Sequence, residues 1–387
     1  MDTEQPEAST PEDIELIGPS GTVDRDALFA LYERQAAVDD ETPVRVEFKL
    51  LKDLEKRLDR YLVDRVPFLS RTQIQRLIDE SAVTVNGRAP KNSTKLRLGD
   101  HIIATLPPPP SGAIQPEDIP LDVLFEDDAI IVVNKPAGLI VHPARSHKTG
   151  TLINALAWRF KNLSGGMLST VGEEFARPGV VHRLDKWTSG AIVAAKNDTA
   201  HWRLGKQFEM RRTDKRYLAI VHGAVPDLVT QIDAPLGKHA TIKEKYAVRH
   251  DDTGKESLTI CRVRERFTLE SGEQFTLVEL ELKTGRTHQI RVHMTWRGYP
   301  LVGDDMYGGK HVTERDLGGT ATTMLLARQA LHATTLGFRH PMTETPMMFT
   351  APVAADLQRA LELLRGSQVS ELLTPPGATI DLASAGV

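Results

Sequence analysis

The chain of 387 residues exceeds the length of one average domain and fits two or three. Its single cysteine, Cys261, excludes a disulfide framework, and we expect neither a membrane helix nor a secretory signal because no apolar run is long enough and the N-terminus is acidic. The formal net charge is −4, yet residues 1–41 hold 12 acidic and 2 basic residues, so residues 42–387 carry a net +6. We therefore expect a monomeric cytoplasmic protein whose acidic terminus masks a basic body.

Residues 1–43 are rich in acidic residues, proline, serine and threonine, and they lack sustained periodicity. A segment of this composition buries too little apolar surface to fold by itself. We therefore expect a disordered tail, apart from a short helix around residues 26–37.

Residues 44–106 have the periodicity of a small folded domain. Apolar residues recur at helical spacing from Leu58 to Val66, and Ser70 begins a capping-box pattern ahead of a second helix. Alternation through residues 82–106, with a turn at Asn86-Gly87, predicts short β-strands after the two helices.

The segment RLDRYLVDRVPFLSRTQIQRLIDESAVTVNGRAPKNSTKLRLGDHI resembles the S4 RNA-binding domain almost from end to end. Basic side chains concentrated on so small a domain are the electrostatic footprint expected for phosphate contacts, although an ordinary solvated face is the alternative. The resemblance therefore implies that this domain binds RNA. The predicted RNA-binding residues here are Arg71, Arg76, Arg88, Lys91, Lys95 and Arg97.

A proline-rich segment, residues 107–120, predicts an extended linker to a second domain. In residues 121–365 strand-like runs alternate with helical ones, and short turns join many of the strands. This pattern favours an α+β fold in which helices flank a mixed, largely antiparallel sheet. Residues 366–387 are expected to form a loose C-terminal tail.

The stretch HRLDKWTSG, residues 182–190, places charged residues between two apolar runs. Alternation along an extended chain would put Arg183 beside Asp185, which fits either a reactive carboxylate next to a cation or an ion pair that only holds a strand. A leucine interrupts the His-Arg-Asp motif of kinases, and Ser189 does not stand in the nucleophile elbow of serine hydrolases. A metal site is the remaining alternative, but its candidate ligands lack zinc-site spacing and we expect no metal; these are His288, His293 and His332.

Three further stretches follow HRLDKWTSG in the sequence: DKRYLAIVHG, TGRTHQIRVH and LVGDDMYGG. Together with VVNKPAGLIVHP before them and LHATTLGFRHP after them, they resemble the RluA-type family of pseudouridine synthases over about residues 121–349. The resemblance implies the pseudouridine synthase fold and a reaction that needs neither a metal nor an organic cofactor. It also implies that Asp185 is catalytic, that Tyr217 packs on the target uracil and that Arg291 pairs with the catalytic carboxylate.

The reaction explains why these residue types are needed. Burial near the target base would raise the pKa of Asp185, and a neighbouring Arg291 would oppose this and keep the carboxylate ionised. Tyr217 would offer a stacking face to a flipped base, unless it is an ordinary core tyrosine. We expect Arg183 to contact RNA or brace the loop, and we interpret His182 as a packing or hydrogen-bonding residue.

The sequence thus predicts an RNA pseudouridine synthase. An S4-like domain joined to an RluA-type domain resembles the branch of the family that acts on large-subunit ribosomal RNA, so we expect this RNA as the partner and no membrane. The alternatives are a transfer RNA pseudouridine synthase and a non-catalytic RNA-binding or ribosome-assembly factor. The stretches NKPAG, residues 134–138, and GDDMYGG, residues 303–309, are interpreted as structural turns.

Overall fold

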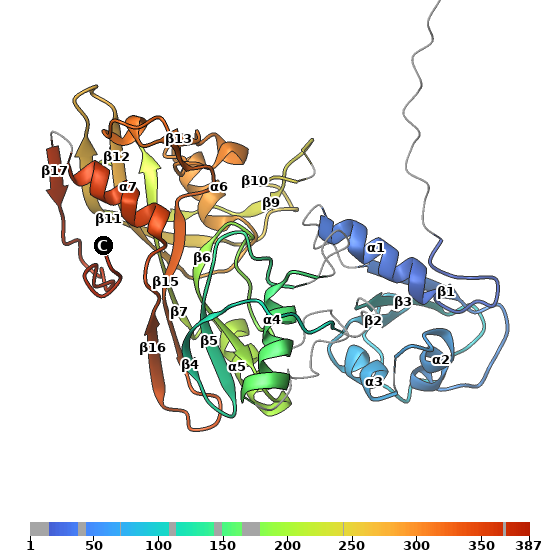
Figure 1. The fold of residues 1–387 in the computed structure, drawn as a ribbon. Helices are drawn as coiled ribbons and strands as arrows, with labels where there is room; N and C mark the ends of the chain where they lie inside the picture. Colours follow the sequence, from blue (N-terminus) through green and yellow to red (C-terminus); the bar gives the residue numbers. More distant parts are fainter. Residues whose placement is uncertain are drawn as a thin grey trace, which may run out of the picture. The chain divides into compact units, whose positions relative to one another are not determined.

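The chain folds into two compact units (Figure 1). The first unit contains the described residues up to 107, and the second contains those from 114 onward. Within the described part of the chain, every helix is too short or too polar to span a membrane. The computed structural model describes residues 15–37, 44–69, 71–107, 114–142, 149–164, 179–242, 244–366 and 369–387.

The first unit packs three helices against a three-stranded antiparallel sheet with the strand order β1-β3-β2. Its core is formed by apolar side chains from both layers, including Leu58, Ile74 and Ile102. The two helices and the short strands that the periodicity predicts are therefore present. The elements are α1 (Arg25–Ala37), β1 (Val44–Lys49), α2 (Leu58–Arg65), α3 (Arg71–Asp79), β2 (Val83–Val85) and β3 (His101–Leu106).

The short helix predicted around residues 26–37 is present as α1, but the structure corrects the expectation that residues 15–37 are disordered or loosely attached. Val23 and Leu28 are buried in the core of the first unit, and Leu31 and Tyr32 pack against it. Leu28, Leu31 and Tyr32 recur at intervals of three and four residues, which gives α1 one apolar face despite the acidic composition around it. Residues 1–14 and 38–43 lie outside the described part of the chain.

The second unit is built on a ten-stranded sheet whose main path is β17-β11-β12-β7-β15-β6-β5-β4, with β16 beside β15 and β8 beside β11. All its strand pairs are antiparallel except β6 with β15, so the predicted mixed, largely antiparallel sheet is confirmed. The sheet strands are β4 (Asp122–Glu126), β5 (Ile130–Lys135), β6 (Ser189–Ala195), β7 (Asp214–His222), β8 (Val229–Asp233), β11 (Leu258–Thr268), β12 (Gln274–Leu282), β15 (Leu331–Arg339), β16 (Pro346–Thr350) and β17 (Val369–Leu372).

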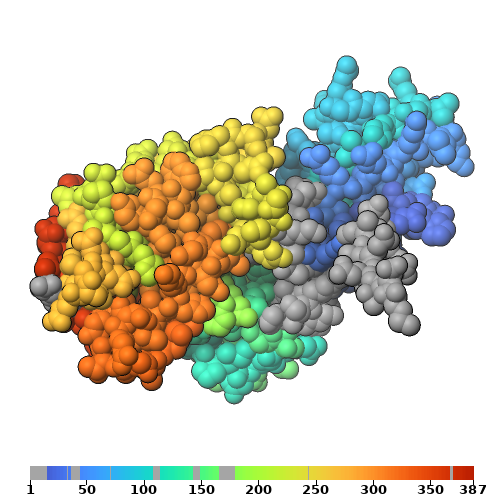
Figure 2. Space-filling model, turned by 90° about the horizontal axis from the view of Figure 1, so that it is seen from above, coloured from blue at the N-terminus to red at the C-terminus, as the bar shows by residue number. Residues whose placement is uncertain are grey.

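Helices flank both faces of this sheet. α4 and α6 pack on the face that bears Tyr217, whereas α5 and α7 pack on the opposite face. In Figure 2 the yellow residues of β9 and β10 lie against the orange residues that include α6. The remaining elements are α4 (Leu152–Arg159), a π-helical turn (Phe160–Ser164), α5 (Asp198–Glu209), β9 (Leu236–Lys238), β10 (Tyr246–Val248), α6 (Gln289–Trp296), two 3₁₀ turns (Asp305–Tyr307 and Arg315–Leu317), β13 (Val312–Thr313), β14 (Met324–Leu326) and α7 (Ala355–Arg365).

Part of the predicted linker belongs to the second unit. The Asn154 side chain donates to the carbonyl of Gln115 at 2.8 Å, and the Glu117 N–H donates to the Asn154 carbonyl at 3.1 Å. These bonds attach residues 114–120 to the start of α4, so this stretch is not a free spacer. Residues 108–113 of the predicted linker lie outside the described residues.

The C-terminal segment is also attached, which corrects the expectation of a loose tail. β17 pairs with β11, Ile380 and Ala385 are buried, and the Ala385 carbonyl accepts a hydrogen bond from the Val353 N–H at 2.9 Å. The segment has little helical or strand periodicity because it binds the sheet largely through its backbone. Of the predicted tail, residues 367 and 368 lie outside the described residues.

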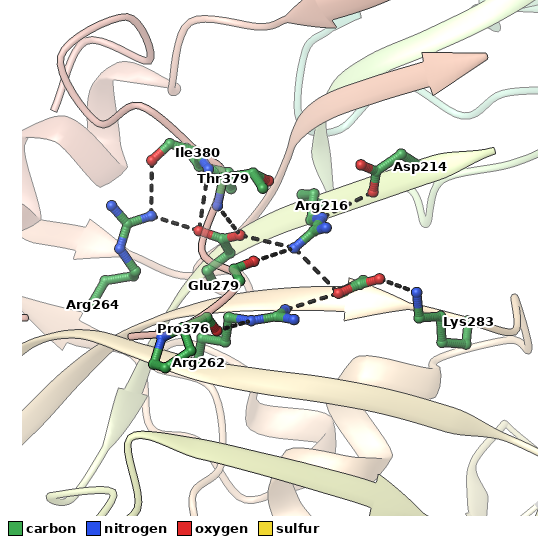
Figure 3. Close-up of polar contacts among 11 residues, drawn as sticks. Asp214, Arg216, Arg262, Arg264, Glu279, Lys283, Pro376, Thr379 and Ile380 are labelled. Carbon is green, nitrogen blue, oxygen red and sulfur yellow. Dashed lines mark hydrogen bonds and ion pairs between the residues drawn. The ribbon is translucent and has the colours of Figure 1, made fainter. Parts of the chain in front are cut away.

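Figure 3 shows how charged side chains of the sheet hold this segment. Glu279, which has no exposed surface, accepts hydrogen bonds from Arg264 at 2.5 Å and from Arg216 at 3.2 Å. The same carboxylate accepts the backbone N–H groups of Thr379 at 3.0 Å and Ile380 at 3.3 Å. A buried carboxylate is therefore compensated by two guanidinium groups and two peptide dipoles.

The guanidinium groups in turn hold carbonyls of the segment. Arg262 Nε donates to Pro376 at 3.0 Å, and Arg216 Nη1 donates to Gly377 at 3.0 Å. Gly377 has φ +75°, and a Cβ there would lie 2.9 Å from Arg262 Nη2, so this position requires glycine. Side-chain alternation along β7 places Arg216 on the face opposite Tyr217. The C-terminal segment therefore covers the back of the strand that carries Tyr217.

Glu279→Gln should destabilise the second unit by about 3 kcal/mol, because it leaves Arg264 and Arg216 short of negative charge in a buried place. Urea unfolding followed by circular dichroism would measure the change. Glu270→Gln, at an exposed position, serves as the control. Equal unfolding midpoints for the two variants would contradict this account of the C-terminal segment.

Candidate active site

Asp185 lies in a loop that leads into β6, not in a strand. The alternation that would place Arg183 beside Asp185 therefore does not apply, because the extended run begins only at Ser189. The Asp185 side chain is 19% exposed, and its Oδ2 accepts a hydrogen bond from Arg291 Nη1 at 3.4 Å. The structure thus brings together Asp185 and Arg291, which lie 106 residues apart in the sequence.

Arg291 projects from α6 and is fixed by Asp304. Its Nε donates to Asp304 Oδ2 at 2.7 Å and its Nη2 to Oδ1 at 2.8 Å, a bidentate arrangement that leaves Nη1 directed at Asp185. Burial by itself would lower the pKa of Arg291. The hydrogen bonds to Asp304 and the negative charges of Asp185 and Asp304 outweigh this effect and hold the pKa above its usual value. The guanidinium group also lies over the Tyr307 ring, with Cζ 4.8 Å from the centroid. Arg291 is therefore a fixed cation.

A second donor faces the same oxygen of Asp185. His288 Nε2 lies 4.0 Å from Asp185 Oδ2, and His288 Nδ1 lies 2.8 Å from the Tyr307 hydroxyl. That hydroxyl accepts the Tyr246 N–H at 2.9 Å, so its own proton is available to donate to His288 Nδ1. This order of donors favours the tautomer with the proton on Nε2, facing Asp185.

Both donors therefore approach Asp185 at Oδ2. Among the described residues, the polar contacts of this carboxylate that involve side chains go to Oδ2, from Arg291 and His288. The side-chain contacts of the carboxylate are thus confined to one of its two oxygens.

Tyr217 is carried by β7 and is 7% exposed. Burial, and then the negative charge of Asp185, raise the pKa of Tyr217 above its ordinary value. The phenol is therefore neutral at physiological pH, and it offers a ring face and a hydroxyl near the carboxylate. Tyr217 belongs to the core cluster that also includes Ile290 of α6, so it occupies the core position named above as the alternative, and its stacking role stays a prediction.

Lys135 fixes the loop that carries Asp185. The side chain has no exposed surface, and its Nζ donates to the carbonyls of Pro136 at 2.8 Å, Leu139 at 2.9 Å and Lys186 at 3.2 Å. Burial lowers the pKa of Lys135 to about 7, against the opposing charge of Asp185. The NKPAG stretch completes β5 at Lys135 and then forms the predicted turn at Ala137 and Gly138, and its lysine also supports the loop of Asp185.

The histidines that the sequence offers as metal ligands are bound to different parts of the protein. His293 binds the Thr259 hydroxyl at 2.8 Å and the Ala234 carbonyl at 2.9 Å, while His332 binds Ser189 at 2.9 Å and the Ala351 carbonyl at 3.2 Å. Their ring nitrogens are thus engaged in the protein. Nothing in the described part of the chain groups three metal-ligating side chains.

His182 packs inside the second unit. Its Nε2 accepts the Val193 N–H at 3.1 Å, and its ring stacks on Phe208 with centroids 4.4 Å apart. Burial lowers the pKa of His182 to about 3, so the ring is neutral. The structure places His182 in the packing and hydrogen-bonding role that the sequence suggests.

The six basic residues predicted to bind RNA on the first unit divide into two that form ion pairs and four that do not. Arg71 donates to Asp59 at 2.9 Å and Arg76 to Glu80 at 2.8 Å, so both are engaged in ion pairs. The other four are exposed, and no ion-pair partner is found for them among the described residues; they are Arg88, Lys91, Lys95 and Arg97. These four are the more available for phosphate contacts.

Comparison with known proteins identifies both units. Residues 56–102 match the S4 domain, and residues 129–296 match the family described as RNA pseudouridylate synthase. A Bacillus subtilis protein named as an uncharacterized RNA pseudouridine synthase is 41% identical over 80% of this chain and 94% of its own length. The chain belongs to the RNA pseudouridine synthase family. The predicted S4 domain, pseudouridine synthase fold and enzyme class are confirmed.

Two further relatives of this pseudouridine synthase carry a more specific name. Proteins named ribosomal large subunit pseudouridine synthase D are 40% identical in Xanthomonas campestris and 38% identical in Pseudomonas aeruginosa. Each match covers 80% of this chain, with 89% of the first relative and 92% of the second. The similarity therefore extends over most of each relative.

The sequence did not identify three residues that support the site, because it interpreted them as parts of structural turns. Asp304 and Tyr307 lie in the GDDMYGG stretch, which reads as a turn, yet they hold Arg291 and His288. Lys135 stands in a stretch that also reads as a turn. The sequence did offer two signals: a lysine at the end of an apolar strand, and two adjacent aspartates where an apolar run gives way to a turn. Neither signal indicates which group the side chain binds.

The pKa of Lys135 predicts a pH dependence of kcat. Below about pH 7 the ammonium group donates to three carbonyls; above it the neutral amine retains two donors, so the Asp185 loop loosens. We expect kcat to fall as pH rises from about 6 to about 8.5, and this alkaline decline should be absent in Lys135→Met, whose kcat is low throughout. A decline of equal size in both proteins would rule out Lys135 as its source.

Proposed function

We propose that this enzyme converts uridine to pseudouridine in large-subunit ribosomal RNA, with Asp185 as the reacting carboxylate. The observation that carries the proposal is the geometry of Asp185, which is held at Oδ2 by Arg291 and leaves Oδ1 for the substrate. Tyr217 provides the stacking face for the uracil, and Arg291 orients the carboxylate through its hydrogen bond to Oδ2.

The reaction breaks the bond between N1 of uracil and C1′ of the ribose, turns the base over and joins C5 to C1′. The hydrogen on C5 is lost and N1 gains a hydrogen, so the reaction is an isomerisation with no net oxidation or reduction. Asp185 Oδ1 acts at the glycosidic bond, either as a nucleophile or as the group that promotes departure of the base. The neutral Tyr217 keeps the detached uracil within the site.

Two features support ribosomal RNA as the substrate. The relatives from Xanthomonas campestris and Pseudomonas aeruginosa are named for the ribosomal large subunit. The exposed basic residues of the S4 domain suit a long structured RNA, since phosphate contacts fix position more than sequence. A hairpin loop or bulge is the expected target because an unpaired uridine is the least costly to flip. Such a substrate agrees with the reducing, cytoplasmic compartment that the single cysteine predicts.

Asp185→Asn should lower pseudouridine formation by at least roughly 10³-fold, since the amide keeps the shape of the side chain but lacks the negative charge of the reactive carboxylate. Affinity for RNA should stay within about twofold of wild type, measured by filter binding. Purified wild-type enzyme, Asp185→Asn and the exposed control Asp227→Asn would be incubated with unmodified ribosomal and transfer RNA transcripts, and the products mapped.

The two parts of the proposal fail separately in this experiment. Wild-type turnover by Asp185→Asn would refute the role of this carboxylate. Modification of transfer RNA alone by the wild-type enzyme would refute ribosomal RNA as the substrate while leaving the role of Asp185 intact.

A further inference from the structure

Trp187 lies two residues after Asp185 and exposes 48% of its surface, whereas Leu184 and Thr188 beside it expose 6% and 2%. A single exposed aromatic residue is common on protein surfaces and needs no special explanation. What distinguishes Trp187 is that the surrounding residues hold it in place without burying it.

The backbone on both sides of the indole is fixed. The Trp187 carbonyl accepts a hydrogen bond from Arg328 Nη1 at 3.0 Å, and Asp356 holds that guanidinium group through two bonds of 2.7 Å. The Lys186 carbonyl accepts the Gly138 N–H at 2.8 Å. The position of Trp187 relative to Asp185 is therefore set by hydrogen bonds to the backbone around it and not by burial of the indole.

The indole ring lies against Gly138, which has no side chain. A Cβ at Gly138 would lie 3.2 Å from Trp187 Cζ3, so a larger residue would push the indole away. Gly138 has φ +87°, which favours glycine there. Lys186, which is exposed, places its Nζ 5.2 Å from the centroid of the indole. The result is a half-exposed aromatic surface on an anchored stretch of backbone, with a cation beside it.

A planar base linked to a phosphate is the ligand that suits this combination. Every nucleobase has a π-face that can stack on an aromatic side chain whatever its sequence, and a lysine ammonium group can contact the phosphate of the same strand. We propose that Trp187 and Lys186 form a stacking subsite for the nucleotide next to the target uridine. The proposal rests on the proposed function, because it takes Asp185 to mark the place of the target.

Such a subsite would lower the cost of extracting the uridine. When a uridine leaves the stack, its neighbour loses a stacking partner, and extrusion costs a few kcal/mol. An indole carried on anchored backbone can replace that partner at a reduced entropic cost, because less of the chain has to be ordered when RNA binds. Trp187 would then contribute to kcat/KM without reacting with the target base.

The test is a double-mutant cycle between protein and RNA. Wild-type enzyme and Trp187→Ala are compared on a synthetic hairpin that contains the mapped target uridine, and on the same hairpin with an abasic residue on its 5′ or 3′ side. Trp187→Phe keeps a stacking ring. Trp202→Ala, at an indole of 46% exposure on α5, is the matched control, and near-ultraviolet circular dichroism checks the fold.

Trp187→Ala should lower kcat/KM on the intact hairpin by about tenfold or more, while Trp187→Phe retains most of it and Trp202→Ala all of it. An abasic residue on one side of the target should lower kcat/KM of the wild-type enzyme by a similar factor of about ten. The same abasic residue should lower kcat/KM of Trp187→Ala by less than about twofold. Lys186→Met should reduce the slope of affinity against salt by about one phosphate contact.

Two results would overturn the proposal. One is wild-type kcat/KM for Trp187→Ala. The other is an equal loss for the wild-type enzyme and Trp187→Ala with each abasic hairpin, which would mean that the indole contacts something other than the neighbouring base, such as a protein. Failure of the proposed function is recognised separately, because the wild-type enzyme would then form no pseudouridine or Asp185→Asn would remain active in the same assay.

Discussion

The ion pairs of Arg291 determine the geometry of the site. A buried guanidinium group is costly unless it is fully paired, and Arg291 meets this requirement by a bidentate bond to Asp304 and a third contact to Asp185. The same contacts fix the direction of the Asp185 carboxylate. Because α6 carries Arg291 and the GDDMYGG turn carries Asp304, helix and turn must pack correctly on the sheet before the carboxylate is oriented.

The sequence predicted the regular elements of the fold better than the segments attached to them. Periodic apolar residues predict the helix that begins at Leu58 and the strand that begins at Asp214. The C-terminal segment does not, because its peptide groups bind buried charges such as Glu279 and its own side chains carry little pattern. In α1 the acidic composition concealed an apolar face formed by few residues, of which Leu28 is fully buried.

For the site, the sequence indicated the residues that we propose to take part in the reaction, but not the residues that hold them in place. Asp185, Tyr217 and Arg291 follow from the motifs, and the structure brings Asp185 and Arg291 into contact. Asp304 and Asp305 are adjacent and chemically identical, and only the fold distinguishes them, since the side chain of the first is 1% exposed and that of the second 76%. The three carbonyls that Lys135 holds are likewise backbone groups that no side-chain pattern reveals.

The central claim is that Asp304 orients the catalytic carboxylate through Arg291, and a comparison of two neighbouring substitutions tests it directly. Single-turnover pseudouridine formation would be measured for Asp304→Asn and for its exposed neighbour Asp305→Asn. The account predicts a loss in kcat on the order of 10²-fold for Asp304→Asn with KM within about twofold, and an unchanged kcat for Asp305→Asn. Wild-type kcat for Asp304→Asn, or an equal loss for both variants, would contradict it.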